Sequence, residues 1–191
     1  MINPVELTKA YRLLNHGPTV LVSSAHDGKR NIMAAAWNMP LDFSPPKVAV
    51  VIDKKTYTRE LIEASGTFAL NVPCLAQAET VMKVGSSSGL ELIGKETDNK
   101  FAAFNLPTFD SSKIEAPLLE GCVGWLECKV IPEPHNQGEY DLFLGIVVAA
   151  WADDRVFSNG HWHFDGQDNL RTVHYIAGGT FMTIGETFNL S

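Results

Sequence analysis

The turn HDGKR, residues 26–30, joins two strand-length runs and constrains the fold more than any other short segment of this chain. Asp27-Gly28 at its centre is typical of a tight hairpin turn, because both residues tolerate the left-handed backbone that such turns need. We therefore predict an antiparallel pair formed by TVLVSSAH before the turn and NIMAAAWNMPLDF after it. At least this part of the sheet is built from strands that are neighbours in the chain.

Further strand-like runs follow, and the segments between them are short. The runs are KVAVVI, TFALNVP, part of IEAPLLEGCVGWLECKVIPEP, and YDLFLGIVVAAWAD, with short extended pieces at HWHFD and in the tail RTVHYIAGGTFMTIG. Helices are expected over 5–15, from Thr56 or Thr58 to Gly66, over 75–85 and around 96–104. Hairpins and short connections favour antiparallel pairing, and only the strand–helix–strand step at 48–72 leaves room for a parallel crossover. We predict a mainly β fold, a closed or half-closed Greek-key barrel with helical inserts, in one domain over 1–191.

Charge and cysteine content exclude several classes of function. The formal net charge of −7 argues against nucleic acid or an anionic membrane as a partner, since both are bound through clustered Lys and Arg. The N-terminus has no signal-peptide pattern, and no run approaches the ~18 apolar residues of a membrane span. Cys74, Cys122 and Cys128 form no CxxC, so we expect reduced, buried thiols in a cytoplasmic protein. Redox chemistry would then come from a bound cofactor.

Three segments carry features of one ligand site. In MAAAW, three small residues, Ala34–Ala36, leave the backbone accessible to a flat ring, and Trp37 offers an aromatic face. The alternative is a strand whose small residues fit under a neighbouring helix. In DKKTYTRE, lysines and threonines surround a helix start, where backbone N–H groups and cations favour a phosphate. The alternative there is a solvated turn with an ordinary cap. SSSGLELIGK supplies hydroxyls, glycines and Lys95, or is simply a polar loop.

Metal and nucleophile chemistry find less support. His161 and His163 in HWHFD lie two residues apart and would point to the same side of a strand, with Asp165 following. A metal site needs at least a third ligand and a closed geometry, so a hairpin rim or an interface is the preferred interpretation. His174 is interpreted as structural. No nucleophile elbow or Cys–His arrangement is present, so we predict neither a metal site nor a catalytic side chain.

Taken together, these segments resemble the flavin reductase-like, FMN-binding split-barrel family. The order of motifs carries the resemblance: N-x-M with three small residues and Trp, an S-P-P step, a strand, a charged K-x-[ST] turn into a helix, then FALNVP. GKETDNKF, APLLEGCVGWLECKV, FLGIVVAAW and HYIAGGTFMTIGE extend it over roughly residues 5–190. Because of Trp37 and the length of the chain, the flavoredoxin-like subgroup of this family is the most similar one.

The resemblance implies FMN as cofactor and assigns residues to it. The flavin ring would lie along Met33, Ala34, Ala35, Ala36, Trp37 and Asn38, with Asn31 on the flavin or its ribityl chain. The phosphate would lie at Lys55, Thr56 and Thr58, and Lys95 would add a polar contact from the middle loop. Proteins of this family are homodimers with FMN near the subunit interface, so a second copy of the chain is an expected partner.

One departure bears on the electron donor. Many members carry G-D-H before the sixth strand, with the histidine on the nicotinamide side, whereas this chain reads GEYDLFLG with Tyr140 in that place. Three functions follow as hypotheses: an oxidoreductase that moves electrons from NAD(P)H or a redox partner through FMN to flavin, ferric or protein acceptors; an FMN electron carrier without NAD(P)H activity; and a barrel that binds another small ligand. The first two hypotheses predict a yellow protein with bound FMN, whereas the third predicts a colourless protein that takes up no FMN.

Overall fold

The computed structural model describes residues 1–10, 13, 17–188 and 190. Its strands are β1 (Ile2–Pro4), β2 (Val20–His26), β3 (Lys29–Ala35), β4 (Asn38–Phe43), β5 (Pro46–Val51), β6 (Thr67–Val72), β7 (Thr108–Phe109), β8 (Leu118–Leu119), β9 (Gly124–Ile131), β10 (Leu142–Asp153), β11 (Phe157–Ser158), β12 (His161–Trp162), β13 (Val173–Ala177) and β14 (Thr180–Thr183). Its helices are α1 (Leu7–Ala10), α2 (Tyr57–Ser65), α3 (Ala78–Gly85), α4 (Lys100–Ala103) and α5 (Pro134–Tyr140), with 3-10 turns η2 (Leu75–Gln77), η3 (Leu90–Leu92) and η4 (Asp168–Leu170).

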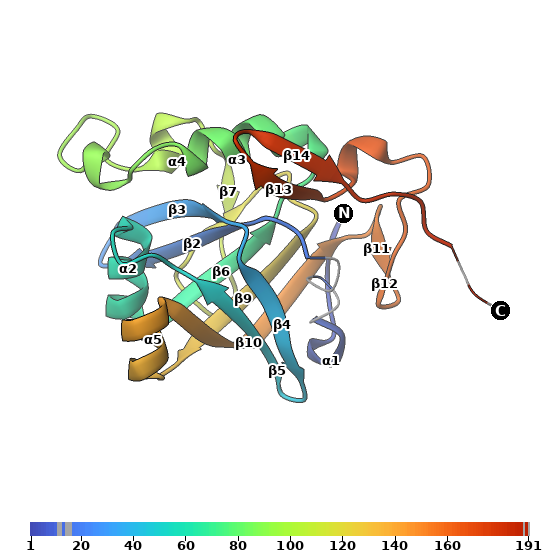
Figure 1. Ribbon diagram of the computed structural model, residues 1–191, viewed down its shortest axis with the longest axis horizontal. Coiled ribbons are helices and arrows are strands. Elements are labelled where there is room, and N and C mark those ends of the chain that lie inside the picture. The colour runs from blue at the N-terminus through green and yellow to red at the C-terminus, as the bar shows by residue number, and fades with distance from the viewer. Residues whose placement is uncertain (11–12, 14–16, 189, 191) are drawn as a thin grey trace.

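The main sheet curls into a barrel (Figure 1). Its strands follow the order β3-β2-β6-β9-β10-β5-β4, with β1 added on β10. β3 and β4 stand at opposite ends of this order, yet only Ala36 and Trp37 separate them in the chain. The two ends of the sheet must therefore meet, although β3 and β4 do not pair with each other in the described part of the chain. The mainly β barrel predicted from the sequence is confirmed.

Two details of the predicted sheet are wrong. The single strand expected over 31–43 is divided, because β3 pairs with β2 whereas β4 turns away to pair with β5. The parallel crossover left open at 48–72 does not occur, since β5 and β6 are not neighbours and the recorded pairings of the main sheet are antiparallel. The hairpin turn is as predicted: Asp27 and Gly28 have φ of 50° and 74°, and His26 pairs with Lys29.

The core lies in two layers that follow the alternation of each strand. On β6, Phe68, Leu70 and Val72 join a cluster with residues of β2, β5, β9 and β10 that fills the barrel interior. The intervening Ala69 belongs to a second cluster with Val81 and Val84 of α3 and Phe101 of α4. Because side chains of a strand point alternately to its two faces, one sheet supports both layers. The second layer fixes α3 and α4 on the outer face of β2 and β3.

The helices match the predictions unevenly. α2 begins after Thr56 and ends at Gly66, whose φ of 68° suits glycine at a helix C-terminus, and it buries Leu61 and Ile62 as expected. The helix expected over 75–85 forms as η2 and α3, whereas the one expected around 96–104 is reduced to α4. α1 covers residues 7–10 of the helix expected over 5–15, and most of the remainder lies outside the described residues. α5 was not predicted.

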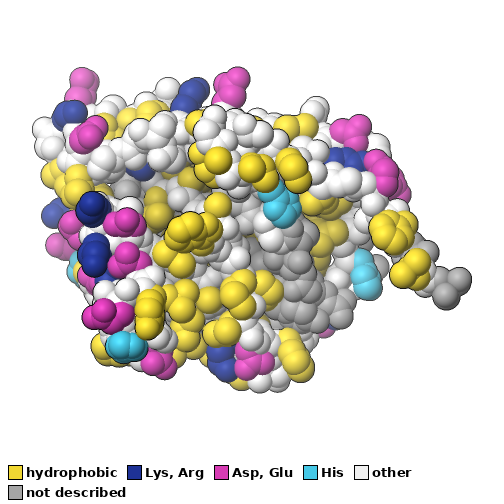
Figure 2. Space-filling model, in the orientation of Figure 1, with side chains coloured by type: hydrophobic (Ala, Val, Ile, Leu, Met, Phe, Trp, Pro, Cys, Tyr) yellow, Lys and Arg dark blue, Asp and Glu magenta, His cyan; other side chains and the backbone are white. Residues whose placement is uncertain are grey.

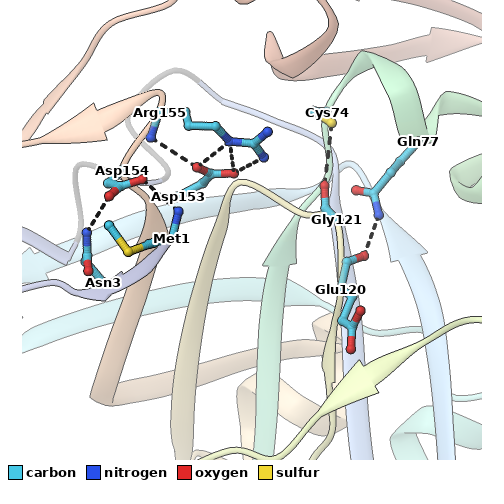
Figure 3. A network of polar contacts seen from close by, with 9 residues as sticks. All are labelled: Met1, Asn3, Cys74, Gln77, Glu120, Gly121, Asp153, Asp154 and Arg155. Carbon is cyan, nitrogen blue, oxygen red and sulfur yellow. Dashed lines mark hydrogen bonds and ion pairs between the residues drawn. The ribbon is translucent and has the colours of Figure 1, made fainter.

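The cysteines are buried and free, which confirms the interpretation as reduced thiols. Burial raises the pKa values of Cys122 and Cys128 well above that of a free thiol, so both are held protonated. The Cys74 Sγ lies 3.6 Å from the Gly121 carbonyl oxygen. Figure 3 shows this contact together with the polar contacts that connect the N-terminal strand to the end of β10. There Asn3 Nδ2 donates to Asp154 Oδ2 at 3.0 Å.

Among the described helices, none combines the length and apolar character needed to cross a membrane.

Candidate functional site

A cavity of about 860 Å³ opens where the two ends of the sheet meet. Five parts of the chain form its walls. They are the segment Met33–Trp37, residues of α3 and just after it (Val81, Met82, Gly85 and Ser86), Asp53 after β5, Glu139–Asp141 at the end of α5, and residues of the β13–β14 hairpin (Tyr175, Ile176, Ala177, Gly178 and Phe181). In Figure 1 this hairpin lies next to α3 above the barrel, and Figure 2 shows apolar side chains gathered below it on the same face. Segments far apart in the sequence therefore converge on one hollow of a size typical of cofactor sites, ~300–1,000 Å³.

The alanine segment serves packing and the cavity at once. Ala34 lies against α3, since a Cβ built on Gly85 would lie 3.3 Å from the Ala34 Cβ, and Ala35 is buried. Ala36 and Trp37 are exposed at the break between β3 and β4, and the Trp37 side chain is 75% exposed. The Trp37 carbonyl accepts a 3.0 Å hydrogen bond from the N–H of Val51, which holds this break in place. Ala34 and Ala35 therefore pack as the small residues of a strand beside a helix, whereas Ala36 leaves its backbone accessible at the break.

Asn31 and Thr58 form a buried polar pair next to the cavity wall. Asn31 is 2% exposed and Thr58 is 0% exposed, and Asn31 Nδ2 donates to Thr58 Oγ1 at 3.0 Å. Within the described residues, Asn31 Oδ1 is buried with no hydrogen-bond partner. A buried acceptor without a donor is destabilising, so this atom calls for a donor from a ligand or a water. The family resemblance assigned both residues to one ligand site, and in the structure their side chains are in direct contact.

Lys55 and Thr56 lie on the exposed turn between β5 and α2. The Asp53 side chain organises this turn, because its Oδ1 accepts from the N–H of Lys55 at 2.8 Å. Thr56 occupies the cap position of α2, but its hydroxyl donates backwards to the Asp53 carbonyl at 2.8 Å instead of capping the helix. The lysine side chain is exposed and the turn stands two residues before Thr58.

Among the predicted residues that lie off the cavity lining, two also stand apart from the Asn31–Thr58 pair and from the turn before α2. Lys95 is exposed in the segment after η3. Asn38 begins β4, and its Nδ2 donates to the Pro18 carbonyl at 2.9 Å and to the Ala35 carbonyl at 3.4 Å. Its side chain therefore pins the junction of β3 and β4 to the chain before β2. The structure gathers Met33–Trp37 around the cavity and places Asn31 and Thr58 beside it, whereas these two residues stand apart.

Sequence reasoning noted Tyr140 only as a departure from the family pattern and did not predict the cavity wall that it forms with Glu139 and Asp141. Arg59 of α2 holds this wall: it is ion-paired with Asp141, and its Nη2 donates to the Gln137 carbonyl at 2.8 Å. The Arg59 guanidinium also lies over the Phe143 ring, 5.2 Å from its centroid. The signals were present, since Pro134 is a good first residue for a helix and Asp141 tolerates the φ of 54° that ends it.

The C-terminal hairpin was predicted only as short strands, without a role. Its tip carries Gly178 and Gly179 at φ of 57° and 84°, and its rings Tyr175 and Phe181 pack edge to face with centroids 5.3 Å apart. The N–H of Tyr175 donates to the hydroxyl of Thr19 at 2.7 Å, which attaches the hairpin to the barrel. The hairpin thereby supplies aromatic side chains to the cavity.

The histidines of HWHFD lie at a separate hairpin. His161 begins β12, and His163 Nε2 lies 2.8 Å from the Ser158 hydroxyl of β11. Across the described ranges, no three His, Cys, Asp or Glu side chains come together in a way that could hold a metal ion.

Comparisons with known proteins agree with this architecture. A family model described as "Flavin reductase like domain" matches residues 12–171. The crystal structure of an FMN-binding domain of a flavin reductases-like enzyme from Shewanella baltica OS155 superposes with a TM-score of 0.93 at 51% identity, covering 100% of this chain and 98% of that one. Flavoredoxin of Desulfovibrio vulgaris (Miyazaki F) has a TM-score of 0.75 at 25% identity, covering 92% and 90%. The uncharacterized protein YddH of Escherichia coli K12 is 46% identical over 186 residues, 96% of this chain and 95% of that one.

Proposed function

This chain belongs to the flavin reductase-like family, and on that premise we propose that it is an FMN-binding oxidoreductase, with residues 1–191 forming one domain around the cofactor. The observation that carries the proposal is the cavity beside Met33–Trp37, with the unpartnered buried acceptor of Asn31 next to it. Two similar structures support the choice of flavin, since one is an FMN-binding domain and the other a flavoredoxin.

The residues present fit a flavin. Ala36 leaves the backbone accessible at the break after β3, where a planar ring needs close approach, and Trp37, Tyr175 and Phe181 offer aromatic surface around the same cavity. Asn31 Oδ1 lacks a donor within the described structure, and the ribityl hydroxyls of FMN are donors of the right kind. We therefore assign the ring to Met33–Trp37 and the ribityl chain to Asn31, with Asn38 holding the strand junction.

The phosphate is assigned to the start of α2. Thr58 accepts from Asn31 through its hydroxyl oxygen and keeps its own proton for donation to an anion. Lys55 and Thr56 lie on the turn just before the helix, where the charge of Lys55 and the N–H groups of the first helical turn would favour a phosphate. We also assign Lys95, whose side chain is exposed on the middle loop, as a further polar contact of the cofactor.

FMN supplies the electron transfer when it is bound, and the protein supplies binding, orientation and a suitable electrostatic environment. Met33 and Ala34 line the cavity from one side, and Tyr175 and Phe181 of the hairpin line it from another. These side chains would exclude water from a flavin ring held between them. Such electron transfer needs no protein acid or base, so we assign no catalytic role to a side chain.

A second copy of the chain is the proposed structural partner. β4 is the last strand in the pairing order, and Met39 and Leu41 are 51% and 45% exposed on it, in line with Trp37 and Phe43. We call the exposed side of Met39, Leu41 and Phe43 the β4 face. An apolar strip of this kind at a sheet edge is unusual for a surface in contact with water alone. Homodimer formation through the β4 face would cover it and enclose the cavity mouth.

The electron donor is either NAD(P)H or a redox partner protein. Tyr140 lines the cavity at the position where many members of the family have a histidine, which favours the alternative of an electron carrier. The test is the visible spectrum of the purified holoprotein under anaerobic conditions, first with NADH, then with NADPH, and finally with dithionite. Bleaching by either nucleotide supports a reductase for flavin, ferric or protein acceptors. Bleaching only by dithionite supports the carrier, and absence of any flavin band after FMN is supplied contradicts the proposal.

A further inference from the structure

The Arg59 side chain connects three elements at the edge of the cavity. It is 8% exposed in the first turn of α2, next to α5 (Figure 1). Its Nη1 donates to the Ile52 carbonyl after β5 at 3.2 Å and is ion-paired with Asp141. Its Nη2 donates to the Gln137 carbonyl of α5 at 2.8 Å, and its Nε donates to Glu63 of α2 at 2.7 Å. A guanidinium bonded on all sides in this way has little freedom, so it holds α5 against the end of β5.

Strand pairing fixes the same corner of the barrel. Leu142, the first residue of β10, pairs with Val51 at the end of β5, and Val51 lines the cavity. On its other side, the N–H of Val51 donates to the Trp37 carbonyl at 3.0 Å. Tyr140 comes two residues before Leu142, and Trp37 comes directly before β4. Trp37 and Tyr140 therefore flank the end of β5 from its two neighbours.

Tyr140 is an exposed aromatic side chain on this rigid support. It is 63% exposed although it lines the cavity, and its ring packs edge to face on His135 with the centroids 5.6 Å apart. Burial in the core does not account for a ring this exposed. The face of an aromatic ring is suited to offset stacking on another planar ring. Because Trp37 is assigned to the flavin, Tyr140 is available to a second molecule in the same cavity.

The charge around this ring is negative. Asp53, Glu139 and Asp141 line the cavity, and no Lys, Arg or His does so among the described residues of the chain. Asp141 is paired with Arg59, and Asp53 accepts from the N–H of Lys55, whereas Glu139 is exposed. An anionic molecule would approach the carboxylate of Glu139, so this end of the cavity favours an uncharged ring.

We propose that Tyr140 is a stacking surface for a planar, uncharged electron acceptor of the quinone class, and that Arg59 is the residue that positions it. This inference rests on the proposed function, because the electrons come from FMN bound in the same cavity. A quinone takes up two electrons and two protons and leaves as the hydroquinone, and the two-electron-reduced FMN that supplies them returns to its oxidised state. Arg59 acts through the wall and does not contact the acceptor. The competing explanation is that the ion pair of Arg59 with Asp141 only stabilises α5.

Binding of two naphthalene derivatives to the oxidised holoprotein tests the stacking surface without turnover. 2-Naphthol is uncharged at neutral pH, and 2-naphthoate carries the same ring with a carboxylate. Dissociation constants are measured from the change in visible flavin absorption for the wild type, Tyr140→Leu, Arg59→Met and the double variant. Arg155→Met is the control, because it removes an ion pair with Asp153 and neither residue lines the cavity.

We expect the wild type to bind 2-naphthol at least about 10-fold more tightly than 2-naphthoate. Tyr140→Leu and Arg59→Met should each weaken 2-naphthol binding about 3- to 10-fold, the loss expected for one aromatic stacking contact. The double variant should bind 2-naphthol no more weakly than Tyr140→Leu alone, because Arg59 acts through the Tyr140 ring. FMN affinity should stay within about 2-fold of the wild type in every variant, and Arg155→Met should bind 2-naphthol as the wild type does.

The reaction itself is followed by stopped-flow reoxidation of the holoprotein after anaerobic reduction. Menadione is an uncharged planar quinone, whereas ferricyanide is an anionic oxidant that needs no stacking. In Tyr140→Leu and Arg59→Met, the menadione concentration at half-maximal rate should rise about 3- to 10-fold, while the limiting rate changes less than about 2-fold. The rate with ferricyanide should stay within about 2-fold of the wild type in both variants.

Several results would overturn the inference. Wild-type 2-naphthol affinity in Tyr140→Leu would exclude the stacking surface, and equal affinity of the wild type for both naphthalene compounds would exclude the preference for an uncharged ring. Wild-type affinity in Arg59→Met, or losses that multiply in the double variant, would leave Arg59 only the stabilisation of α5. A wild type that takes up no FMN overturns the proposed function, whereas one that binds FMN but neither naphthalene compound overturns this inference alone.

Arg59→Lys replaces Arg59→Met if circular dichroism shows that the methionine variant does not fold. The lysine keeps a cation beside Asp141 but lacks the second nitrogen that bonds the Gln137 carbonyl. It should weaken 2-naphthol binding and leave FMN affinity unchanged. Wild-type affinity for 2-naphthol in Arg59→Lys would contradict the positioning role.

Discussion

Asn31 on β3 and Thr58 on α2 are joined by a 3.0 Å hydrogen bond between their buried side chains. The bond connects the strand that lines the cavity to the helix start that we assign to the phosphate. It leaves Asn31 Oδ1 without a partner in the described part of the chain, and it leaves the Thr58 proton available for donation. The ribityl chain and the phosphate of one FMN molecule would satisfy both groups.

Thr58→Val keeps the shape of the side chain and removes its hydroxyl. The variant should lose about 1–3 kcal/mol in the free energy of unfolding, because Asn31 Nδ2 is left buried and unpaired. FMN affinity should fall about 10-fold through the lost phosphate contact. Chemical denaturation and flavin fluorescence measure the two effects. Thr8→Val, on the exposed side of α1, should change neither, and unchanged FMN affinity in Thr58→Val would exclude Thr58 from the site.

Gly89 is expected to tolerate no side chain. Its backbone has φ of −66°, which suits alanine, but the added Cβ would lie 2.5–2.7 Å from the Asn31 side chain. Gly89→Ala should therefore lose about 1–3 kcal/mol of stability by overpacking and should weaken FMN binding by displacing Asn31. Gly138→Ala is the control, because nothing lies within 4 Å of its Cβ position inside α5. That variant should gain about 0.5–1 kcal/mol from helix propensity, with FMN affinity intact.

Trp37→Ala should separate ligand contact from folding. The side chain is 75% exposed, so its removal should change stability by less than about 0.5 kcal/mol. In the holoprotein, loss of the ring should shift the visible flavin bands and reduce the quenching of flavin fluorescence. Trp125→Ala is the contrasting variant. Because Trp125 is buried, this substitution should lower the free energy of unfolding by about 3–5 kcal/mol. A flavin spectrum identical to that of the wild type would place the cofactor away from Trp37.

Charge placed on the β4 face should prevent dimer formation. The double variant Met39→Lys, Leu41→Lys puts two cations on exposed apolar positions of β4, where a second copy would bury them. Light scattering should give the mass of two chains for the wild type and of one for the variant. Leu75→Lys, 39% exposed on η2, should remain dimeric. A wild type that is monomeric at all concentrations would contradict the proposed partner.

Burial lowers the pKa of Lys100, which is 3% exposed at the start of α4, and this predicts a dependence of stability on pH in the absence of flavin. The folded-state pKa is about 8 and the ordinary value is 10.5, so between these values the unfolded chain holds a proton that the folded protein has released. Stability should therefore rise with pH over this window, by up to about 3 kcal/mol, with the penalty fully present below pH 8. Denaturation of wild type and Lys100→Met across this range isolates the effect, and equal slopes for the two proteins would show that Lys100 titrates normally.

The parts of the fold that depend on local pattern were predictable. The β2–β3 hairpin follows from Asp27-Gly28, and α2 follows from its apolar spacing and from Gly66. The break at Ala36–Trp37 was not predictable, because neither Gly nor Pro marks it and strand-like residues continue on both sides. The chain leaves β2 there and forms a hairpin with β5, and the point at which one strand partner is exchanged for the other depends on the closure of the whole barrel.

The site was predictable where a side chain and its backbone segment act together. Met33–Trp37 line the cavity as expected, because the segment itself forms the wall. Lys95 and Lys100 show the limit: both belong to GLELIGKETDNKF, yet one is exposed and the other is buried under α3. Burial of that kind comes from packing between α3, α4 and β3, and no residue spacing within the loop encodes it. The wall held by Arg59 and Asp141 was missed for the same reason, since 82 residues separate the two partners.

Titration of the flavin-free protein with FMN, followed by visible absorption and flavin fluorescence, tests whether this cavity is a flavin site. We expect saturation at one FMN per chain, with shifted flavin bands and quenched fluorescence. Absence of saturable binding, with the protein folded as judged by its circular dichroism, would contradict the assignment of Met33–Trp37 and Asn31 to a flavin and leave the cavity to another ligand.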